Sequence, residues 1–266
     1  MKSKTFSIAV FDIDGTLTDG DGQPDTEALS AIRDLSERGI RIVIATARGP
    51  SSLTTFTDAI GIVEVIAFQG ALVGSFEAGE WVTETELTIP IESARAIARQ
   101  AEALELPTSW HHAMSWWVTK RTAEISREER IVGESPTEVG DSESISWAPH
   151  KLMFISPEGE EDLLESLASR LPKGLAHTRS HPNYLEVTHR GANKGVALEA
   201  MLRRLPADAS QVVAFGDGDN DLPLFEVAAV SVAMPHAPSQ VREMATITAT
   251  EGIPQVLRSL EWAPFE

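Results

Sequence analysis

Two carboxylates, Asp12 and Asp14, follow directly after the apolar run Phe6-Ser7-Ile8-Ala9-Val10-Phe11. Such a run is typical of a strand that is covered on both faces in a parallel sheet. Ligands of open α/β sheets bind beyond the carboxyl ends of the strands, so both carboxylates are expected where such folds carry out chemistry. The stretch Asp12-x-Asp14-Gly15-Thr16 is compatible with a solvated turn. It also suits a carboxylate nucleophile with a second carboxyl group as acid and base.

A second acidic group, Asp217-Gly218-Asp219-Asn220-Asp221, follows the apolar run Gln211–Phe215. Its spacing resembles a calcium loop, but Leu222 stands where an EF-hand needs glycine and Ala228 where it needs glutamate. The group is better explained as part of one site with Asp12 and Asp14. Two like charges about 4 Å apart cost roughly 4 kcal/mol at an effective dielectric near 20, so converging carboxylates need a cation. All-oxygen ligands favour Mg2+.

Three further side chains could bind an anion. Thr46 and Arg48 follow a second apolar strand, Ile40–Ala45, and Lys194 stands at the predicted start of a helix. A cation is disfavoured at a helix start unless an anion lies nearby. Each residue also has a purely structural interpretation: a strand-end hydroxyl for Thr46, an ion pair for Arg48 and a solvated surface lysine for Lys194.

The order of the predicted elements indicates an α/β fold with a parallel sheet. A helix over Thr26–Arg38, with Asp25 as cap and Gly39 as stop, connects the first strand to the second. Another helix, at about 51–60, leads to a third strand that begins at Val63. A hairpin over 71–85 comes next. The sheet is then expected to resume with a helix from Lys194 to about Arg204 and strands at 211–215, 229–234 and 245–248.

Over residues 86–187 the pattern of predicted elements differs from the parallel α/β pattern before and after it. This difference indicates an inserted α+β domain. Its aromatic patch, Trp110–Val118, is more typical of a small core than of a surface that stacks on a ligand. His111 and His112 should point to opposite faces of a strand, so they are not expected to bind one metal together. A loop is predicted over Lys120–Ser144. The other expected elements are helices at 91–106 and 161–171 and strands at 151–156 and 184–188.

The motifs in this order, Asp12-x-Asp14-Gly15-Thr16, Thr46, Lys194 and Gly216 to Asp221, resemble the haloacid dehalogenase superfamily of phosphohydrolases. The insertion resembles the type IIB (C2B) cap of its Cof-like members. The resemblance implies a Rossmann-like parallel-sheet core formed by residues 1–85 and 188–266, with an inserted α+β cap over 86–187.

The family's roles carry over to matching positions. Asp12 would be the nucleophile and a Mg2+ ligand, and Asp14 the acid and base that also offers its backbone carbonyl to the metal. Asp217 would be the second side-chain ligand, with Asp221 supporting the metal shell. Thr46 and Lys194 would bind the phosphoryl group. Asn220 and Arg48 are possible additional site residues.

Three positions depart from the Cof-like pattern: Ala47 replaces the usual Gly, Gln69 the usual Asn, and Pro235-His236 the usual Gly-Asn. These changes leave the roles of Ala47, Gln69, His236 and Arg48 in substrate contact open. The presence of Asp14 argues against dehalogenation, because the dehalogenating members lack an acid at this position.

The composition excludes several partners. The formal net charge of -18 opposes binding to nucleic acid and anionic membranes. No apolar run is long enough to cross a bilayer. Met1–Lys4 lead into the first strand without an apolar signal region, and the chain has no cysteine, so a cytoplasmic protein is expected.

The sequence therefore predicts a Mg2+-dependent phosphomonoester hydrolase that acts on a small phosphorylated metabolite, with a sugar phosphate as the first choice. The alternatives are a phosphosugar mutase, whose cap would need to hold a second phosphate, and a phosphate-binding protein without turnover. The few clustered cations of the cap, Lys120-Arg121 and His177 to Arg179, favour hydrolysis over the mutase. The oligomeric state is not predicted.

Overall fold

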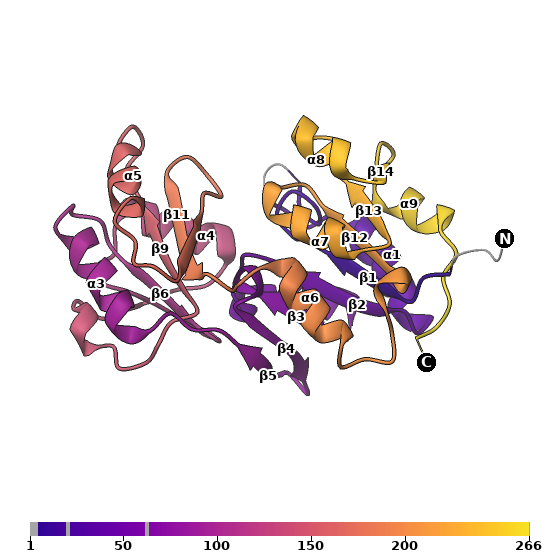
Figure 1. The fold of residues 1–266 in the computed structure, drawn as a ribbon, viewed down its shortest axis with the longest axis horizontal. Helices are drawn as coiled ribbons and strands as arrows, with labels where there is room; N and C mark the ends of the chain where they lie inside the picture. Colours follow the sequence, from indigo (N-terminus) through magenta and orange to yellow (C-terminus); the bar gives the residue numbers. More distant parts are fainter. Residues whose placement is uncertain (1–4, 20–21, 62–63, 266) are drawn as a thin grey trace. The chain divides into compact units, whose positions relative to one another are not determined.

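The computed structural model describes residues 5–19, 22–61 and 64–265 (Figure 1). Met1–Lys4, on which the expectation about a signal region depends, and Val63, the first residue of the third predicted strand, lie outside them. The chain divides into two compact units. The first takes in residues 1–48, 53–85 and 193–266, and the second takes in 86–192 with the short segment Gly49–Ser52. Among the described helices, none has the length and apolar character needed to cross a membrane.

The first unit is built on an eight-stranded sheet (Figure 1). Six neighbouring strands are parallel, and the hairpin that follows β3 adds antiparallel strands at one edge. Every residue of β1 is buried, as its apolar run predicts. The strands in sheet order are β14 (Ile247–Thr248), β13 (Val230–Ala233), β12 (Val212–Gly216), β1 (Ile8–Phe11), β2 (Arg41–Ala45), β3 (Glu64–Ala67), β4 (Leu72–Glu77) and β5 (Glu80–Glu86).

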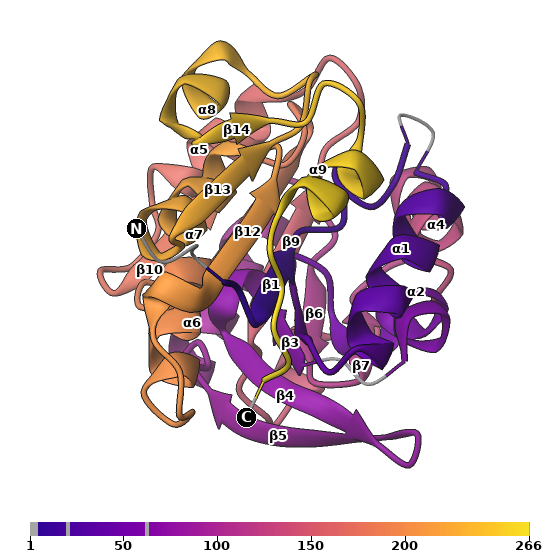
Figure 2. The same ribbon diagram turned by 90° about the vertical axis from the view of Figure 1, so that its right-hand side faces the viewer.

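Helices cover both faces of this sheet (Figure 2). One face carries α1 (Thr26–Glu37), α2 (Thr54–Ile60) and α9 (Ile253–Ser259), and α1 contacts both of the others. The other face carries α6 (Lys194–Leu202), α7 (Leu222–Val227) and α8 (Ser239–Met244), whose apolar side chains form one core with alternate residues of β1, β2 and β12. Burial on both faces explains why these strands are apolar throughout instead of alternating.

The predicted elements of the first unit are confirmed within a few residues. The predicted helix over Thr26–Arg38 is α1, and the carboxylate of its N-cap, Asp25, accepts hydrogen bonds from the backbone N–H groups of Glu27 and Ala28. The predicted hairpin over 71–85 is the β4–β5 pair. These elements were predictable because caps, turns and apolar runs are local signals.

The second unit contains a six-stranded sheet, antiparallel except where β7 pairs with β8. It reaches Ala192, past residue 187 where the cap is predicted to end, because β11 continues to His189 and pairs with β10 there. Its strands in sheet order are β10 (Leu175–Thr178), β11 (Tyr184–His189), β9 (Lys151–Ile155), β6 (Ser109–His112), β7 (Ser115–Val118) and β8 (Thr137–Glu138). Its helices are α3 (Ile91–Glu102), α4 (Ala123–Val132) and α5 (Asp162–Ala168).

The aromatic patch forms core on both faces of this sheet. Trp110 is buried in a cluster with apolar residues of α3 and α5. Trp116 is buried in a second cluster with Ile125 of α4. His111 stacks on Trp116, whereas His112 lies against Trp147. The two histidines therefore point away from each other, as strand alternation predicts.

The loop predicted over Lys120–Ser144 is wrong, because this segment contains α4 and β8. The Thr122 side chain accepts a hydrogen bond from the backbone of Ile125, and Gly133 ends the helix in a left-handed conformation. Only Ile125 of α4 is buried. A helix with so narrow an apolar stripe gives little periodic signal, although its two caps are visible in the sequence.

A buried histidine joins two segments of the second unit. The Nε2 atom of His150 lies 2.9 Å from a carboxylate oxygen of Glu86, and its Nδ1 atom accepts a hydrogen bond from the backbone N–H of Ala113 at 3.1 Å. The ring of His112 stacks on it, with 4.7 Å between ring centroids. Burial, and then the nearby His112, lower the pKa of His150 to about 4, although Glu86 opposes this shift. His150 is therefore neutral at pH 7.

Candidate active site

The strand order of the first unit brings the predicted motifs to one edge of the sheet. Strand β1 lies between β2 and β12, and Phe11 is in register with Ile44 on one side and Phe215 on the other. The residues that follow these strands, Asp12, Thr46 and Asp217, therefore leave the sheet at the same end. The backbone N–H of Asp12 continues the pairing by donating to the Phe215 carbonyl at 3.0 Å.

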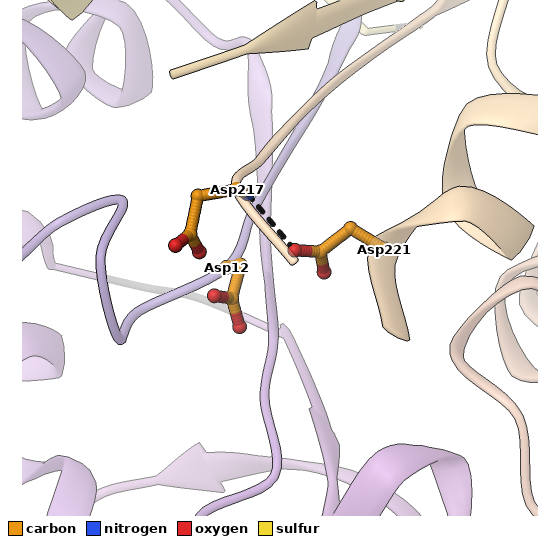
Figure 3. Close-up of side chains that lie close together, drawn as sticks. All are labelled: Asp12, Asp217 and Asp221. Atoms are coloured by element: carbon orange, nitrogen blue, oxygen red, sulfur yellow. Dashed lines mark hydrogen bonds between the residues drawn. The ribbon is translucent and has the colours of Figure 1, made fainter. Parts of the chain in front are cut away.

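Three carboxylates converge at this edge. Asp12, Asp217 and Asp221 each offer an oxygen that lies within 4.8 Å of the other two (Figure 3). Asp12 and Asp221 are buried, and Asp217 is partly exposed. The sequence places Asp12 about two hundred residues from the other two, so this cluster is a product of the parallel pairing of β1 with β12.

Lys194, at the start of α6, lies among these acids. Its completely buried ammonium group donates to Asp12 Oδ1 and to Asp221 Oδ1, both at 2.7 Å. Burial alone would lower the pKa of Lys194, but the two carboxylates outweigh it and raise the pKa above its usual value. The lysine is therefore charged, and the interpretation as a solvated surface residue is wrong.

Lys194 supplies one positive charge to three carboxylates. Burial, followed by the charge of Asp221, raises the pKa of Asp12 well above its usual value despite the bond to Lys194. Burial and Asp221 likewise raise the pKa of Asp217 to about 6. An all-oxygen donor set with this excess of negative charge is suited to a hard divalent cation, and the cluster could hold one.

Asp221 also shapes the loop that carries Asp217. Its Oδ2 accepts hydrogen bonds from the backbone N–H groups of Asp217 and Gly218, each at 3.0 Å. A Cβ atom at Gly216 would lie 2.5 Å from this carboxylate, and one at Gly15 would lie 2.3 Å from Asp217 Oδ2. The two glycines are thus needed where the backbone passes close to the acids.

Thr46 and Asn220 each form a hydrogen bond with a residue outside the cluster. Thr46 is completely buried, and its Oγ1 accepts a hydrogen bond from the backbone N–H of Arg48 at 3.1 Å. The side-chain amide of Asn220 donates to Gln69 Oε1 at 3.3 Å. Gln69, whose role the sequence leaves open, is buried with a positive φ of 60°.

Asp14 does not join the three carboxylates with its side chain. Its carboxylate is 55% exposed and pairs with Arg48, whose Nη2 donates to Oδ1 at 2.5 Å. The sequence motif predicts the closeness of Asp14 to Asp12 but not this partner. The predicted contribution of Asp14 to a metal is its backbone carbonyl, and that stays a prediction.

His236 is a residue of the site whose position the sequence does not predict. Its Nε2 lies 3.6 Å from Asp217 Oδ2, and its charge when protonated opposes the raised pKa of Asp217. The loop after β13 brings it there, since β13 pairs with β12 directly. The departure of Pro235-His236 from the Cof-like pattern is the one sequence signal that marks it.

A family model described as haloacid dehalogenase-like hydrolase matches residues 9–252. This chain belongs to the haloacid dehalogenase-like hydrolases. The matched span contains every candidate site residue from Asp12 to His236. The predicted membership of this superfamily and the predicted enzyme class, a haloacid dehalogenase-type phosphatase, are confirmed.

Relatives of this hydrolase match it over nearly its full length. YcsE of Bacillus subtilis, named 5-amino-6-(5-phospho-D-ribitylamino)uracil phosphatase, is 26% identical over 255 residues, which cover 94% of each chain. The crystal structure of TM0651 from Thermotoga maritima is 26% identical with a TM-score of 0.85, covering 98% of this chain and 100% of that one. BT4131, described as a subclass IIB sugar phosphatase, is 21% identical with a TM-score of 0.80 and covers 95% of this chain and 98% of its own. The likeness to BT4131 shows the fold, and the predicted fold class is confirmed.

Proposed function

We propose that this chain is a Mg2+-dependent phosphomonoesterase that forms an aspartyl-phosphate on Asp12 and acts on a small phosphorylated sugar or sugar alcohol. The observation that carries the proposal is the convergence of Asp12, Asp217 and Asp221 around the buried ammonium group of Lys194. A buried nucleophile, acidic ligands and a fixed cation are the parts that phosphoryl transfer needs.

In the first step, a carboxylate oxygen of Asp12 attacks phosphorus. The bond between phosphorus and the ester oxygen breaks, and its electron pair leaves with that oxygen. Asp14 supplies the proton that this oxygen takes up, so the product is a neutral alcohol. Lys194 bonds Asp12 through Oδ1 and fixes the direction of the nucleophile.

In the second step, water regenerates the enzyme. Asp14, now a carboxylate, takes a proton from a water molecule as its oxygen attacks the phosphorus of the aspartyl-phosphate. The bond between phosphorus and Asp12 breaks, and inorganic phosphate is released. An acyl phosphate is readily hydrolysed, so two easier steps replace a difficult one.

Residues around the phosphoryl group are proposed to stabilise its negative charge during transfer. Thr46 and Lys194 are proposed to bind the phosphoryl oxygens. Mg2+ would be held by Asp12 and Asp217, by the backbone carbonyl of Asp14 and with the support of Asp221. When bound, it would neutralise negative charge on the carboxylates and on the phosphoryl group.

The substrate class is supported by one relative and by the charge of the chain. YcsE acts, by its name, on a uracil that carries a phosphorylated ribityl chain. We propose a substrate of this general kind, a phosphorylated sugar or sugar alcohol with or without a heterocycle. The formal net charge of -18 supports a small substrate over a nucleic acid.

Two further parts of the proposal concern the second unit and the compartment. We propose that the unit of residues 86–192 acts as the cap domain predicted from the sequence. We also propose the cytoplasm as the compartment, because a chain of 266 residues without a cysteine suits a reducing environment.

The test is release of inorganic phosphate from p-nitrophenyl phosphate and from a panel of sugar and sugar alcohol phosphates. Wild type and Asp12→Asn are compared with Mg2+ and with chelator. We expect metal-dependent turnover in wild type and a loss of at least about a thousand-fold in Asp12→Asn, the scale on which removal of a nucleophile acts. Acid quenching during turnover should trap phosphate on wild type only.

Asp34→Asn is the matched control, because Asp34 is an exposed aspartate on α1. It should retain wild-type turnover. Folded wild-type protein that binds Mg2+ but releases no phosphate from any ester would overturn the proposal and favour a binding protein. Transfer of the phosphoryl group to a second sugar phosphate instead of water would favour the mutase.

A further inference from the structure

Arg48 holds the carboxylate of Asp14 by both oxygens. Its Nη2 donates to Oδ1 at 2.5 Å and its Nε donates to Oδ2 at 3.0 Å. This two-point contact fixes the plane of the carboxylate as well as its position, which a single contact cannot do. The Asp14 side chain is 55% exposed, so little else restricts its rotation, whereas that of Arg48 is only 10% exposed.

Arg48 is itself held in place by the loops that follow β2 and β3. Its backbone N–H donates to Thr46 Oγ1 at 3.1 Å, and its backbone carbonyl accepts from the Phe68 N–H at 3.1 Å. Its guanidinium group lies 5.8 Å from the centre of the Phe56 ring. The arginine is therefore the fixed member of the pair, and the carboxylate takes its orientation from it.

The surroundings of Asp14 would otherwise turn it away from the site. The charge of Asp14 is close enough to Asp12 and Asp217 to contribute to the raised pKa of each. Like charges repel, so an unpaired carboxylate at this position would rotate towards solvent. The positive charge of Arg48 opposes that rotation, because it is paired directly with the Asp14 carboxylate.

We propose that Arg48 is a positioning residue that orients the carboxyl group of Asp14 for proton transfer to the leaving oxygen. This inference rests on the proposed function, in which Asp14 is the acid of the first step. Arg48 donates hydrogen bonds only. The proton passes from Asp14 to the ester oxygen as the bond to phosphorus breaks. Loss of Arg48 therefore impairs departure of the leaving group without removing the nucleophile.

Leaving groups separate this role from direct phosphate binding. An alkoxide must be protonated as it leaves, whereas p-nitrophenolate is a stable anion that needs little help. The value of kcat/KM reports the first step, before water enters, so it isolates the acid role of Asp14 from its later role as base. The quantity to measure is thus the ratio of kcat/KM for an alkyl phosphate, such as ribitol 5-phosphate, to that for p-nitrophenyl phosphate.

In Arg48→Gln, we expect kcat/KM for the alkyl ester to fall by about 10 to 100-fold, the scale on which a displaced catalytic group acts. The fall for p-nitrophenyl phosphate should be at least several-fold smaller, so that the ratio drops. Asp14→Asn should change the ratio in the same direction. The double variant should be no worse on the alkyl ester than Asp14→Asn alone, because residues that act as a unit are not additive.

Arg48→Lys and Arg41→Gln complete the experiment. Lysine keeps the charge but cannot make the two-point contact, so it should restore the ratio only in part. It also carries the test if Arg48→Gln does not fold. Arg41 forms an Arg–Glu pair with Glu64 at the opposite end of β2, so Arg41→Gln controls for losing such a pair and should leave the ratio unchanged.

Two results would overturn the inference. An equal fall in kcat/KM for both esters, with Arg48→Gln and Asp14→Asn additive, would mean that Arg48 binds the phosphoryl group directly. An unchanged ratio would mean that the ion pair is structural only. In either case wild type still releases phosphate, whereas failure of the proposed function would show as no release by wild type from any ester.

Discussion

The ammonium group of Lys194 donates to Asp221 Oδ1 at 2.7 Å, and both side chains are completely buried. A second bond of the same length joins Lys194 to Asp12. One side chain thus supports Asp12, the proposed nucleophile, and the acidic loop after β12 together. This double role makes Lys194 the point at which stability and activity of the site depend on each other.

Lys194→Met should therefore cost stability as well as activity. Removing one member of a buried ion pair leaves an uncompensated charge and costs about 3–5 kcal/mol. The free energy of unfolding in urea, measured at pH 7 with chelator, checks this value. Lys194→Met combined with Asp221→Asn should regain part of the loss, because one unpaired carboxylate is removed. A cost below about 1 kcal/mol for Lys194→Met would contradict the arrangement.

Asp217→Asn should weaken metal binding but should not destabilise the metal-free protein. The pKa of Asp217 is raised to about 6 in the folded chain from a usual 3.8, so folding favours its protonated form. Stability from this group is present below pH 3.8 and is lost as the pH rises through 6, by up to about 3 kcal/mol. With chelator at pH 7 to 8, the asparagine variant should be at least as stable as wild type.

With Mg2+ present, wild type should be the more stable of these two proteins. Under the proposed function, Mg2+ should raise the melting temperature of wild type, because a ligand that binds the native state stabilises it. Asp217→Asn should gain much less, since it has lost a carboxylate of the cluster. Thermal unfolding with and without Mg2+ measures both effects. Equal gains in both proteins would exclude Asp217 as a ligand.

Because His150 is buried in its neutral form, the second unit should lose stability as the pH falls. Its folded pKa is lowered to about 4 from a usual 6.5, so the unfolded chain binds more protons between these values. Stability from the neutral ring is present above pH 6.5 and is lost as the pH falls towards 4, by up to about 3 kcal/mol. Urea unfolding from pH 7 to pH 4.5, followed by tryptophan fluorescence, should show this fall.

His150→Asn is the comparison for that measurement. Asparagine can still accept the hydrogen bond from the Ala113 backbone, but it does not titrate. The variant should be less stable than wild type at pH 7 and should lose less on acidification. Parallel curves for the two proteins would assign the acid sensitivity to other groups.

Gly216→Ala should damage the site without a change of charge. The added methyl group would lie 2.5 Å from the Asp221 carboxylate, which must then move away from Lys194 and the loop amides. Turnover and Mg2+ affinity should each fall by about tenfold or more, as expected when catalytic groups are displaced. The assays are phosphate release and isothermal titration with Mg2+.

Gly218→Ala is the matched control, two residues further along the same loop. There the added methyl group meets only the tip of the Asn220 side chain at a comparable distance, and that side chain can turn aside. It should keep most of the turnover and the metal affinity. A larger loss in Gly218→Ala than in Gly216→Ala would refute the role given to the Asp221 contact.

The core of the site could be predicted because strand ends carry local signals. Asp12 and Asp217 each follow an apolar run, and a parallel sheet brings such ends to one edge. The pairs Arg48 with Asp14 and His236 with Asp217 could not be predicted. They depend on the direction in which side chains leave their loops, and no periodic pattern encodes that direction.

The second unit was harder to predict than the first for a related reason. Helix α4 and strand β10 each bury little apolar surface, since only Ile125 of α4 is buried and no residue of β10 is. Without an apolar stripe, a segment of polar residues looks like a loop. Strands β9 and β11 are buried over four or more consecutive residues, and their predicted bounds nearly match the observed ones.

The central place of β1 in its sheet also affects the order in which the two units can fold during synthesis. Ribosomes make β1 and its neighbour β2 well before its other neighbour, β12, which begins only at Val212. The intervening residues 86–192 form a unit of mostly local antiparallel pairs, which fold faster than distant parallel ones. A nascent chain that stops before Val212 would therefore hold a finished second unit while β1 has β2 as a neighbour and still lacks β12.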